Sequence, residues 1–343
     1  MSAIDPTAMD RDGTPSRSTP ALGGADAALP AGLAARAEAY AALALAPATR
    51  RAYRFDWTHF QAWCADTGVA AFPTTPHILG LYLAAHAGRL AVATLERRMA
   101  TIAALHQRAG MRLDLGDAGL AAVWAGIRRA HGAPPAAKVA LSTEQLRQAV
   151  ASLPDTMKGV RDRALLLLGY AAALRRSELV GLDVEPGGDA LGWIEITGEG
   201  LLVVLRRSKE NVSGRDLERV PVPRGRHAET CPVGAVEAWL ARAGHRAGPL
   251  FRSVRRGGHP TARRLSGEDV ARAVKAVAVT LGLDPRAVAG HSLRAGFITA
   301  VAGEGAPDSE IMAQTRHRDV GVMRRYIRRA RLYQDTPARR LDL

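Results

Sequence analysis

Apolar residues recur at three- and four-residue steps over four stretches in the first third of the chain, a spacing that predicts amphipathic helices. In the first stretch Tyr53, Trp57 and Phe60 share one face. The pair Thr75-Pro76 is typical of a helix N-cap followed by the first helical position. The four predicted helices cover residues 47–66, 76–86, 91–109 and 117–130.

Between residues 190 and 222 the apolar period changes to two, which predicts three short strands joined by turns. The strands are residues 193–196, 202–205 and 219–222. Helical periods flank them, and Ser142 with Gln145 forms a capping-box signature for one of the helices. These helices cover residues 142–153, 159–173, 232–243, 266–281, 292–303, 307–314 and 319–329. The fold class is therefore mainly α with a small antiparallel β-sheet.

Composition divides the chain into segments. Residues 1–42 are rich in Ala, Gly, Pro, Ser and Thr and have no apolar period, so we expect a flexible N-terminal arm. Residues 132–140 contain two adjacent prolines and read as a linker. We expect a four-helix domain over residues 43–131 and a larger α+β domain, with a C-terminal tail, over residues 141–343.

The charge of the chain narrows the class of partner. The net charge is +14 and the pI is about 10.8, an excess that attracts polyanions, of which nucleic acid is the commonest. Residues 48–138 hold eleven basic and five acidic residues. We expect their arginines on the outer helical face, contacting phosphates rather than bases; the candidates are Arg50, Arg51, Arg97 and Arg98. The alternative is a merely solvated basic face in an arginine-rich protein.

The sequence does not support a membrane protein, a secreted protein, or an enzyme that binds a nucleotide or zinc. No window is apolar enough to span a membrane, and the first thirty residues do not resemble a signal peptide, so we expect a cytoplasmic protein. Cys64 and Cys231 match no ligand spacing and are predicted to be buried thiols. No Walker loop, GxGxxG, HExxH or paired CxxC motif is present, so we expect no cofactor and no metal.

The candidate chemistry lies mainly near the C-terminus. His291 and Arg294 are three residues apart and share a face if helical, and His317 precedes Tyr326 by nine residues. Two further basic residues complete the set. Arg175 follows a strongly apolar helix, and Lys209 lies in a turn between two strands. The candidate catalytic residues are Arg175, Lys209, His291, Arg294, His317 and Tyr326.

This set suits the transfer of a DNA strand to a tyrosine. A phenol oxygen attacks a phosphodiester in line and a 5′ hydroxyl departs. Two arginines hold the non-bridging oxygens, on which negative charge gathers. A lysine or histidine protonates the leaving oxygen, and a nearby histidine helps the tyrosine to lose its proton. The covalent phosphotyrosine keeps the bond energy, so resealing needs neither ATP nor a metal.

Each residue also has a plainer interpretation. Tyr326 is a half-buried core tyrosine in that view, and Tyr333 is a rival nucleophile that lacks the nine-residue spacing from a histidine. Lys209 is a solvated turn residue. The two histidines are satisfied core residues or metal ligands, although neither has a second ligand at helical spacing. Arg175 forms a structural ion pair with Glu178, which is compatible with a catalytic role.

The set resembles the tyrosine recombinases, or phage integrases, over about residues 45–343. Leu174-Arg175-x-Ser177-Glu178 is similar to their first arginine motif, Ser208-Lys209 to their hairpin lysine, and His291-x-Leu293-Arg294 to their HxxR motif. Residues 326–328 also resemble the Cre-like branch. The resemblance implies a core-binding domain, a catalytic domain, and duplex DNA bound by a homo-oligomer, as a dimer per site and a tetramer at the synapse.

By the same resemblance, Arg175 and Arg294 clamp the scissile phosphate and Lys209 protonates the leaving oxygen. His291 assists proton transfer at the nucleophile Tyr326, and His317 binds a phosphate oxygen. The implied activity is site-specific recombination or DNA integration for a mobile element. The alternatives are a relaxing enzyme of the type IB topoisomerase kind and a DNA-binding protein of the same fold that lost cleavage.

One position departs from the family pattern. The family usually has Leu-Gly before the second histidine, where this chain has Thr315-Arg316. Glycine permits a close turn there. An arginine at this place either crowds the turn or adds a phosphate contact, and it is the feature that invites the cleavage-deficient alternative.

Overall fold

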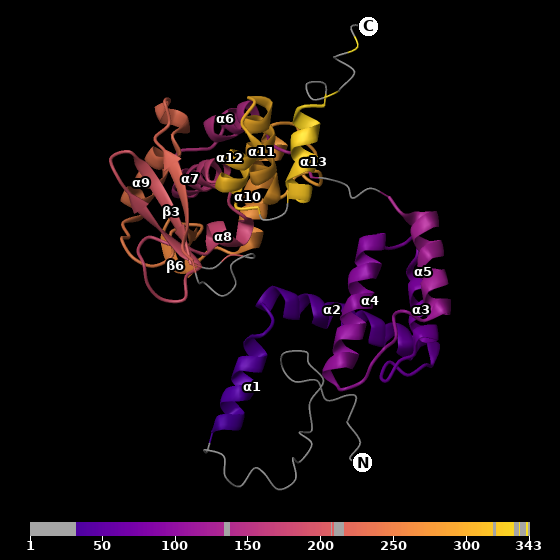
Figure 1. Cartoon of the computed structure of the whole chain (residues 1–343). Helices are drawn as coiled ribbons and strands as arrows, with labels where there is room; N and C mark the ends of the chain where they lie inside the picture. Colours follow the sequence, from indigo (N-terminus) through magenta and orange to yellow (C-terminus); the bar gives the residue numbers. More distant parts are fainter. Residues whose placement is uncertain are drawn as a thin grey trace. The chain divides into compact units, whose positions relative to one another are not determined.

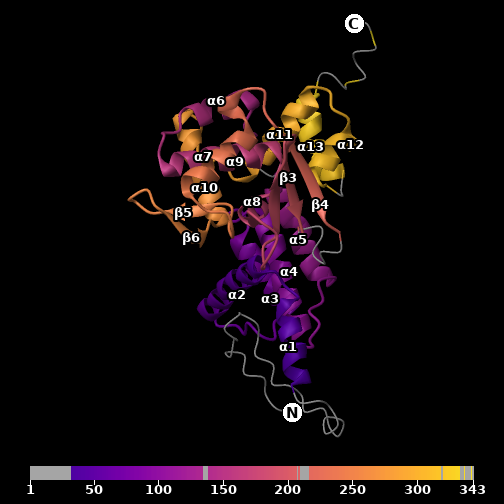
Figure 2. The same ribbon diagram turned by 90° about the vertical axis from the view of Figure 1, so that its left-hand side faces the viewer.

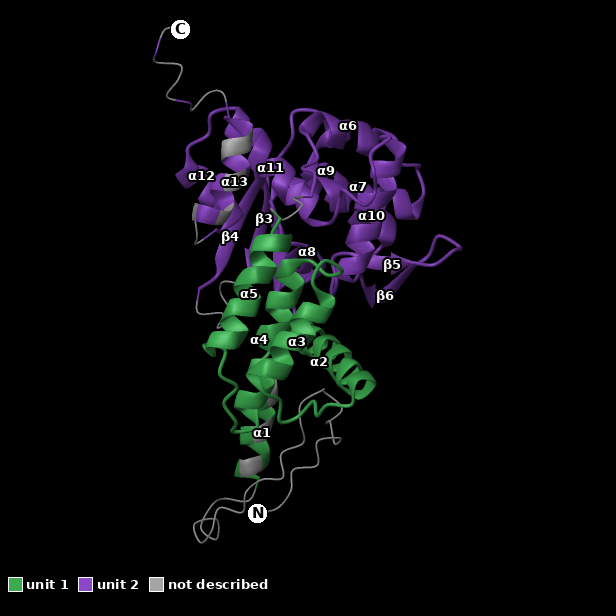
Figure 3. Cartoon of the chain, turned by 90° about the vertical axis from the view of Figure 1, so that its right-hand side faces the viewer, with its two compact units in different colours: residues 1–135 green, residues 136–343 purple. Residues whose placement is uncertain are grey.

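The structure is a computed structural model that describes residues 32–133, 138–206, 208, 216–317, 320–332, 336 and 341. The chain divides into two compact units, residues 1–135 and 136–343 (Figure 3). The division falls within the stretch predicted as a linker. The arm predicted over residues 1–42 lies outside the described residues up to residue 31, and its end is helical, because the first helix begins at Leu33.

The first unit is helical wherever it is described as regular structure. Its helices are α1 (Leu33–Leu43), α2 (Pro47–Thr67), α3 (Pro76–His86), α4 (Val92–Arg108) and α5 (Ala118–His131) (Figure 1). The predicted N-cap is present, since the Thr75 hydroxyl accepts a hydrogen bond from the Ile78 amide over 3.3 Å. Helix α2 ends at Thr67 and is capped by Gly68, which has a φ of 72°, a left-handed conformation that glycine adopts without strain.

The core of this unit forms between α2, α3, α4 and α5. Trp57 and Phe60 of α2 are buried and pack at 5.7 Å between ring centroids. Phe60 also meets Tyr82 of α3 edge to face at 5.0 Å, an arrangement that aromatic rings favour. Leu95 and Ile102 bring the apolar face of α4 against them. The helical period of these apolar positions therefore predicts the buried face correctly.

The second unit combines helices with two small sheets. Its elements are α6 (Thr143–Ala151), α7 (Met157–Ala171), α8 (Arg176–Val180), β1 (Leu182–Asp183), β2 (Gly192–Ile196), β3 (Gly200–Leu205), β4 (Glu218–Pro223), η2 (Ala228–Thr230), α9 (Pro232–Ala243), β5 (Arg252–Val254), β6 (Pro260–Arg264), α10 (Gly267–Thr280), α11 (His291–Gly303), α12 (Asp308–Thr315) and α13 (Val320–Ala330) (Figures 1 and 2).

The larger sheet has the strand order β1-β2-β3-β4. Strands β2, β3 and β4 pair antiparallel, as predicted, and β1 adds a short parallel pairing to β2. Burial alternates along β4, where Val220 and Val222 face the core and the residues beside them are exposed. The fold is mainly helical with small antiparallel sheets, which confirms the predicted fold class.

Helix α7 lies in the interior of the second unit and packs against both α9 and α11 (Figures 1 and 2). Its residues from Ala164 to Tyr170 are all buried, which explains why its sequence is apolar on every side. Two glycines allow close approach. A Cβ on Gly169 would meet Leu293 at 3.1 Å, and a Cβ on Gly296 would meet the Leu141 carbonyl oxygen at 2.1 Å.

Five short elements were not predicted, namely α8, β1, η2, β5 and β6. Each is five residues or fewer and has no apolar period, so no pattern in the sequence indicates it. In the described part of the chain, no helix combines the length and the apolar character needed to cross a lipid bilayer. The two cysteines are buried free thiols, as predicted, and burial raises the pKa of Cys64 to about 11.

Candidate active site

Arg175 lies at the junction between α7 and α8. Helix α7 ends in a tight turn in which Ala173 has a φ of 46°, and Arg175 is the N-cap residue of α8. The Glu178 carboxylate accepts hydrogen bonds from the Arg175 backbone amide and guanidinium, both at 2.8 Å. The side chain of Arg175 is 16% exposed, so its position is fixed while part of it faces solvent.

Glu178 is buried, with 1% of its side chain exposed, and it has a second cationic partner. The guanidinium of Arg316 donates to its Oε2 over 2.6 Å. Burial alone would raise the pKa of Glu178, but Arg316 and the backbone amide and guanidinium of Arg175 outweigh it, and the pKa is lowered. The carboxylate therefore stays ionised at neutral pH and holds two arginines.

Arg294 is completely buried, and main-chain oxygens fix its guanidinium. Nη1 donates to the Ala173 carbonyl over 2.7 Å, and Nη2 donates to the Thr315 carbonyl. Nη2 also lies 3.2 Å from Nε2 of His317. Because Arg294 is on α11, this one side chain connects that helix with the end of α7 and the end of α12.

His317 follows the α12 C-cap and is surrounded by cationic groups. Its Nδ1 lies 2.8 Å from the Thr315 hydroxyl oxygen. That hydroxyl donates its own proton to the Ile311 carbonyl, so it accepts a proton from Nδ1. Burial, followed by the charges of Arg294 and Arg175, lowers the pKa of His317 to about 4. The ring is therefore neutral at pH 7, with Nε2 as its acceptor atom.

His291 and Tyr326 lie side by side. His291 is the first residue of α11 and Tyr326 is on α13, and these two helices pack together. The centroids of the two rings are 6.2 Å apart with an interplanar angle of 55°. Partial burial, followed by the charges of Arg294 and Arg175, lowers the pKa of His291 below its ordinary value of 6.5. A neutral imidazole is thus placed beside the candidate nucleophile.

Lys209 lies outside the described residues. Its neighbour Ser208 is described, and the Ser208 hydroxyl donates to Oε1 of Glu218 over 3.2 Å. Glu218 is the first residue of β4 and also pairs with Arg316, whose Nε lies 3.3 Å from Glu218 Oε2. The residue before Lys209 is thus connected to the turn that carries His317.

Contacts bring together the other five predicted residues from three separate parts of the sequence. Arg175 comes from the α7–α8 junction, His291 and Arg294 from α11, and His317 and Tyr326 from the chain around α13. Two guanidinium groups beside two neutral imidazoles can bind an oxyanion and accept a proton. Within the described residues, no cluster of three or more His, Cys, Asp or Glu side chains could ligate a metal ion.

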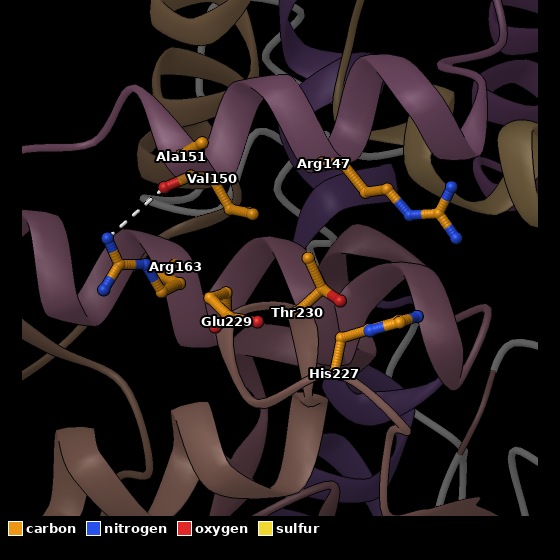
Figure 4. A pocket seen from close by; sticks show the side chains of 7 residues that line it. All are labelled: Arg147, Val150, Ala151, Arg163, His227, Glu229 and Thr230. Atoms are coloured by element: carbon orange, nitrogen blue, oxygen red, sulfur yellow. Dashed lines mark hydrogen bonds between the residues drawn. The ribbon is translucent and has the colours of Figure 1, made fainter.

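A surface cavity of about 570 Å³ lies elsewhere in this unit, between α6, α7 and η2. Figure 4 shows the side chains that line it, Arg147, Val150, Ala151, Arg163, His227, Glu229 and Thr230. None of them belongs to the predicted set. A hydrogen bond of 3.3 Å from Arg163 to the Val150 carbonyl joins two of the lining residues.

The candidate DNA-binding arginines differ in their surroundings. Arg51 is exposed and Arg50 is half-buried on α2. Arg97 is 44% exposed and pairs with Asp56. The prediction that Arg98 lies on the outer face is wrong, because only 3% of its side chain is exposed.

The guanidinium of Arg98 lies 2.8 Å from His59 Nδ1, donates to the Tyr82 hydroxyl over 3.0 Å and lies 3.6 Å from Asp56. These buried polar partners offset part of the cost of taking the charge out of water. The spacing contained a signal for this, because Arg98 follows Leu95 by three residues and precedes Ile102 by four, which places it on the core face.

The structure shows how Arg316 is accommodated in the turn where the family usually has glycine. It has φ 57° and ψ 40°, the left-handed conformation in which glycine is favoured. Its side chain is 7% exposed and turns inward to Glu178 and Glu218, so it neither blocks the turn nor reaches outward to a phosphate. Glu218 was missed from the sequence, where no spacing signals its partners.

Comparison with known proteins shows the family to which the chain belongs. The family model described as "Phage integrase family" matches residues 140–332. A relative described as an "Integrase/recombinase xerD homolog" of Selenomonas ruminantium is 34% identical over 298 residues, 85% of each chain. A "Tyrosine recombinase XerD" of Xanthomonas axonopodis pv. citri (strain 306) is 35% identical over 48% of this chain and 50% of its own. The chain belongs to the phage integrase family, and thus to the tyrosine recombinases, which cleave and rejoin DNA strands.

Solved structures share the fold. The XerH site-specific recombinase bound to palindromic difH substrate, in a post-cleavage complex, matches with a TM-score of 0.63 at 13% identity, over 86% of this chain and 80% of its own. A lambda integrase (75–356) dimer bound to a COC′ core site matches with a TM-score of 0.55 at 13% identity, over 86% of this chain and 93% of its own.

Proposed function

We propose that this tyrosine recombinase uses Tyr326 to attack a DNA phosphodiester at a specific site, with Arg175, Arg294 and His317 around the phosphate. The observation that carries the proposal is the placement of a neutral His291 beside Tyr326, with 6.2 Å between ring centroids, next to two anchored guanidinium groups. These groups come from distant parts of the sequence, and a solvated basic surface would not need them to converge.

The proposed reaction exchanges one phosphodiester for another. The bond between the Tyr326 phenol oxygen and phosphorus forms while the bond between phosphorus and the 5′ oxygen breaks. The phenol proton passes to His291, which is neutral because its pKa is lowered. Lys209 gives a proton to the departing 5′ oxygen. The product is a 3′-phosphotyrosine, and attack by a 5′ hydroxyl of the partner strand reverses the same steps.

Electrostatic stabilisation in this proposal comes from the arginines. Negative charge grows on the non-bridging oxygens in the transition state, and guanidinium groups that are already fixed need no reorganisation to meet it. Arg294 is fixed by two carbonyl oxygens and Arg175 by Glu178. His317 can donate to the phosphate from Nε2 once that atom takes up a proton, because Nδ1 already donates to Thr315.

We further propose that the chain acts on duplex DNA as a homo-oligomer, with a dimer on each site and a tetramer at the synapse. The net charge of +14 supports binding to a polyanion. The lambda integrase neighbour is a dimer on its core site, which supports the first step of such an assembly. Strand exchange between two sites needs two such dimers.

The test is covalent capture on a nicked suicide substrate that carries DNA flanking the gene. With EDTA present and no ATP, the wild-type protein should form an adduct on one strand at one position. Relaxation of any supercoiled plasmid without that position would instead indicate an enzyme of the type IB topoisomerase kind. Binding to the mapped position with no adduct would contradict the proposal.

A further inference from the structure

Arg316 occupies a place in the fold where its conformation is costly. A non-glycine residue in the left-handed region costs about 1–2 kcal/mol, and such strain persists only where surrounding contacts hold it. The contacts here are two carboxylates, Glu178 Oε2 at 2.6 Å and Glu218 Oε2 at 3.3 Å. Nη1 also donates to the Gln314 carbonyl over 3.3 Å, whereas the approach of Nε to Glu218 is an ion pair without hydrogen-bond geometry.

The two carboxylates lead to two different parts of the site. Glu178 holds the backbone amide and the guanidinium of Arg175, both at 2.8 Å. Glu218 accepts from the hydroxyl of Ser208 over 3.2 Å, and Ser208 directly precedes Lys209. Arg316 itself directly precedes His317. One side chain therefore connects Arg175 with Ser208, the residue directly before Lys209, and with the turn before His317.

The Arg316 guanidinium holds the carboxylates of Glu178 and Glu218 close together in a region of low solvent exposure. The side chain of Glu178 is 1% exposed and that of Glu218 is 18% exposed. Two carboxylates this close to one guanidinium would repel each other without it, and burial would then favour the protonated form of Glu178. A protonated Glu178 would hold the Arg175 guanidinium less firmly, because the hydrogen bond would lose its charge assistance.

We propose that Arg316 is a positioning residue for strand cleavage: it fixes Arg175 and the segment before Lys209 relative to His317. A glycine at this turn can adopt the backbone conformation but provides no such connection. The inference depends on the proposed function, because it assigns Arg316 a role in the same site. The Arg316 guanidinium turns inward to Glu178 and Glu218 and acts through these two carboxylates.

The test compares the variants Arg316→Gly and Arg316→Lys with the wild type in single-turnover cleavage of the suicide substrate, at saturating DNA and from pH 5 to pH 8. Arg316→Gly should lower the cleavage rate by on the order of 10²-fold with little change in Kd, since small misplacement of binding groups has costs of this size. Arg316→Lys should recover part of the rate, because lysine keeps the positive charge but lacks the forked guanidinium that reaches both carboxylates.

The pH profile separates a positioning role from a general loss of structure. In Arg316→Gly the pKa of Glu178 rises, so cleavage should fall off at a higher pH than in the wild type. In Arg316→Lys the pH of half-maximal rate should stay close to that of the wild type. Two charged side chains contact the Glu178 carboxylate. Arg175 is the N-cap residue of the helix that carries Glu178, and Arg316 caps the end of α12.

The matched control is Arg331→Gln. The guanidinium of Arg331 donates to the Ala302 carbonyl over 2.8 Å and pairs with Asp308 at 3.6 Å, and neither partner belongs to the site. This variant should lower the melting temperature without moving the pH profile. A cleavage rate and pH profile of Arg316→Gly equal to those of the wild type would overturn the inference. A loss of rate with an unmoved pH profile, as expected of general destabilisation, would also overturn it.

A second measurement needs no cleavage. The Glu178 carboxyl carbon is titrated by NMR in the wild type and in Arg316→Lys and Arg316→Gly. A rise of about one pKa unit or more in Arg316→Gly supports the connection, and no rise overturns it. If the wild type forms no adduct while this shift is present, the proposed function fails and the contact between Arg316 and Glu178 stands. If the adduct forms and no shift is seen, only the inference about Arg316 fails.

Discussion

Nη1 of Arg294 donates a hydrogen bond over 2.7 Å to the carbonyl oxygen of Ala173, 121 residues earlier in the chain. Ala173 has a φ of 46°, and the turn that contains it leads directly into Arg175. One predicted phosphate-binding arginine therefore fixes the backbone next to the other. The two guanidinium groups therefore depend on each other through the main chain.

Arg294→Lys should impair both stability and cleavage. A lysine cannot offer the planar fork that satisfies the carbonyls of Ala173 and Thr315 together. A buried carbonyl left without a donor costs about 1–3 kcal/mol, so the free energy of unfolding should fall by a similar amount in urea titration. The single-turnover rate should fall by about 10²-fold or more. An unchanged free energy of unfolding would contradict this account of how Arg294 is held.

His317 should titrate far below an ordinary histidine. NMR titration of its ring proton in the free protein should give a pKa of about 4. Because the folded-state pKa lies below the unfolded value of about 6.5, the unfolded chain takes up the proton first. His317 therefore contributes stability that is present above pH 6.5 and is lost as the pH falls toward 4.

Binding of DNA or of inorganic phosphate should raise the His317 pKa, since an anion near Nε2 favours the protonated ring. The control is His245, which is buried beside the Pro249 carbonyl, away from the candidate site, and should not respond to DNA. A midpoint of 6.5 or higher for His317 in the free protein would contradict the neutral form described here.

Substitution of Arg51 should affect DNA binding, whereas substitution of Arg98 should affect the stability of the fold. Arg51 is exposed, so Arg51→Gln should lower the salt dependence of DNA affinity by about one unit of slope and leave the melting temperature unchanged. Arg98 is buried beside Asp56, so Arg98→Gln should cost about 3 kcal/mol of folding free energy, because one partner of a buried charge pair remains. DNA titrations at several salt concentrations and urea unfolding provide both readouts. Equal effects of the two variants on DNA binding would contradict this separation.

Local signals predicted most of the fold. The caps at Thr75 and Ser142 are where the sequence places them, because an N-cap depends only on residues three positions apart. Period-two runs likewise marked β2, β3 and β4. The short elements α8 and β1 carry no such signal, and they form because neighbouring parts of the chain hold them.

The site was predictable as a set of residues and not as a set of contacts. Spacing identified His291, Arg294, His317 and Tyr326, since these lie within one stretch of the chain. The partners that fix the site, such as the pair of Arg316 with Glu178, are 138 residues apart and leave no periodic trace. The inward direction of the Arg316 side chain follows from the tertiary structure alone.

The central claim is that Tyr326 is the nucleophile, and peptide mapping of the covalent adduct tests it most directly. The adduct from the suicide substrate is digested with protease and nuclease, and the modified peptide is sequenced by mass spectrometry. The account predicts a nucleotide remnant on the oxygen of Tyr326, no adduct with Tyr326→Phe, and a normal adduct with Tyr333→Phe. A remnant on Tyr333 or on any other residue would contradict it.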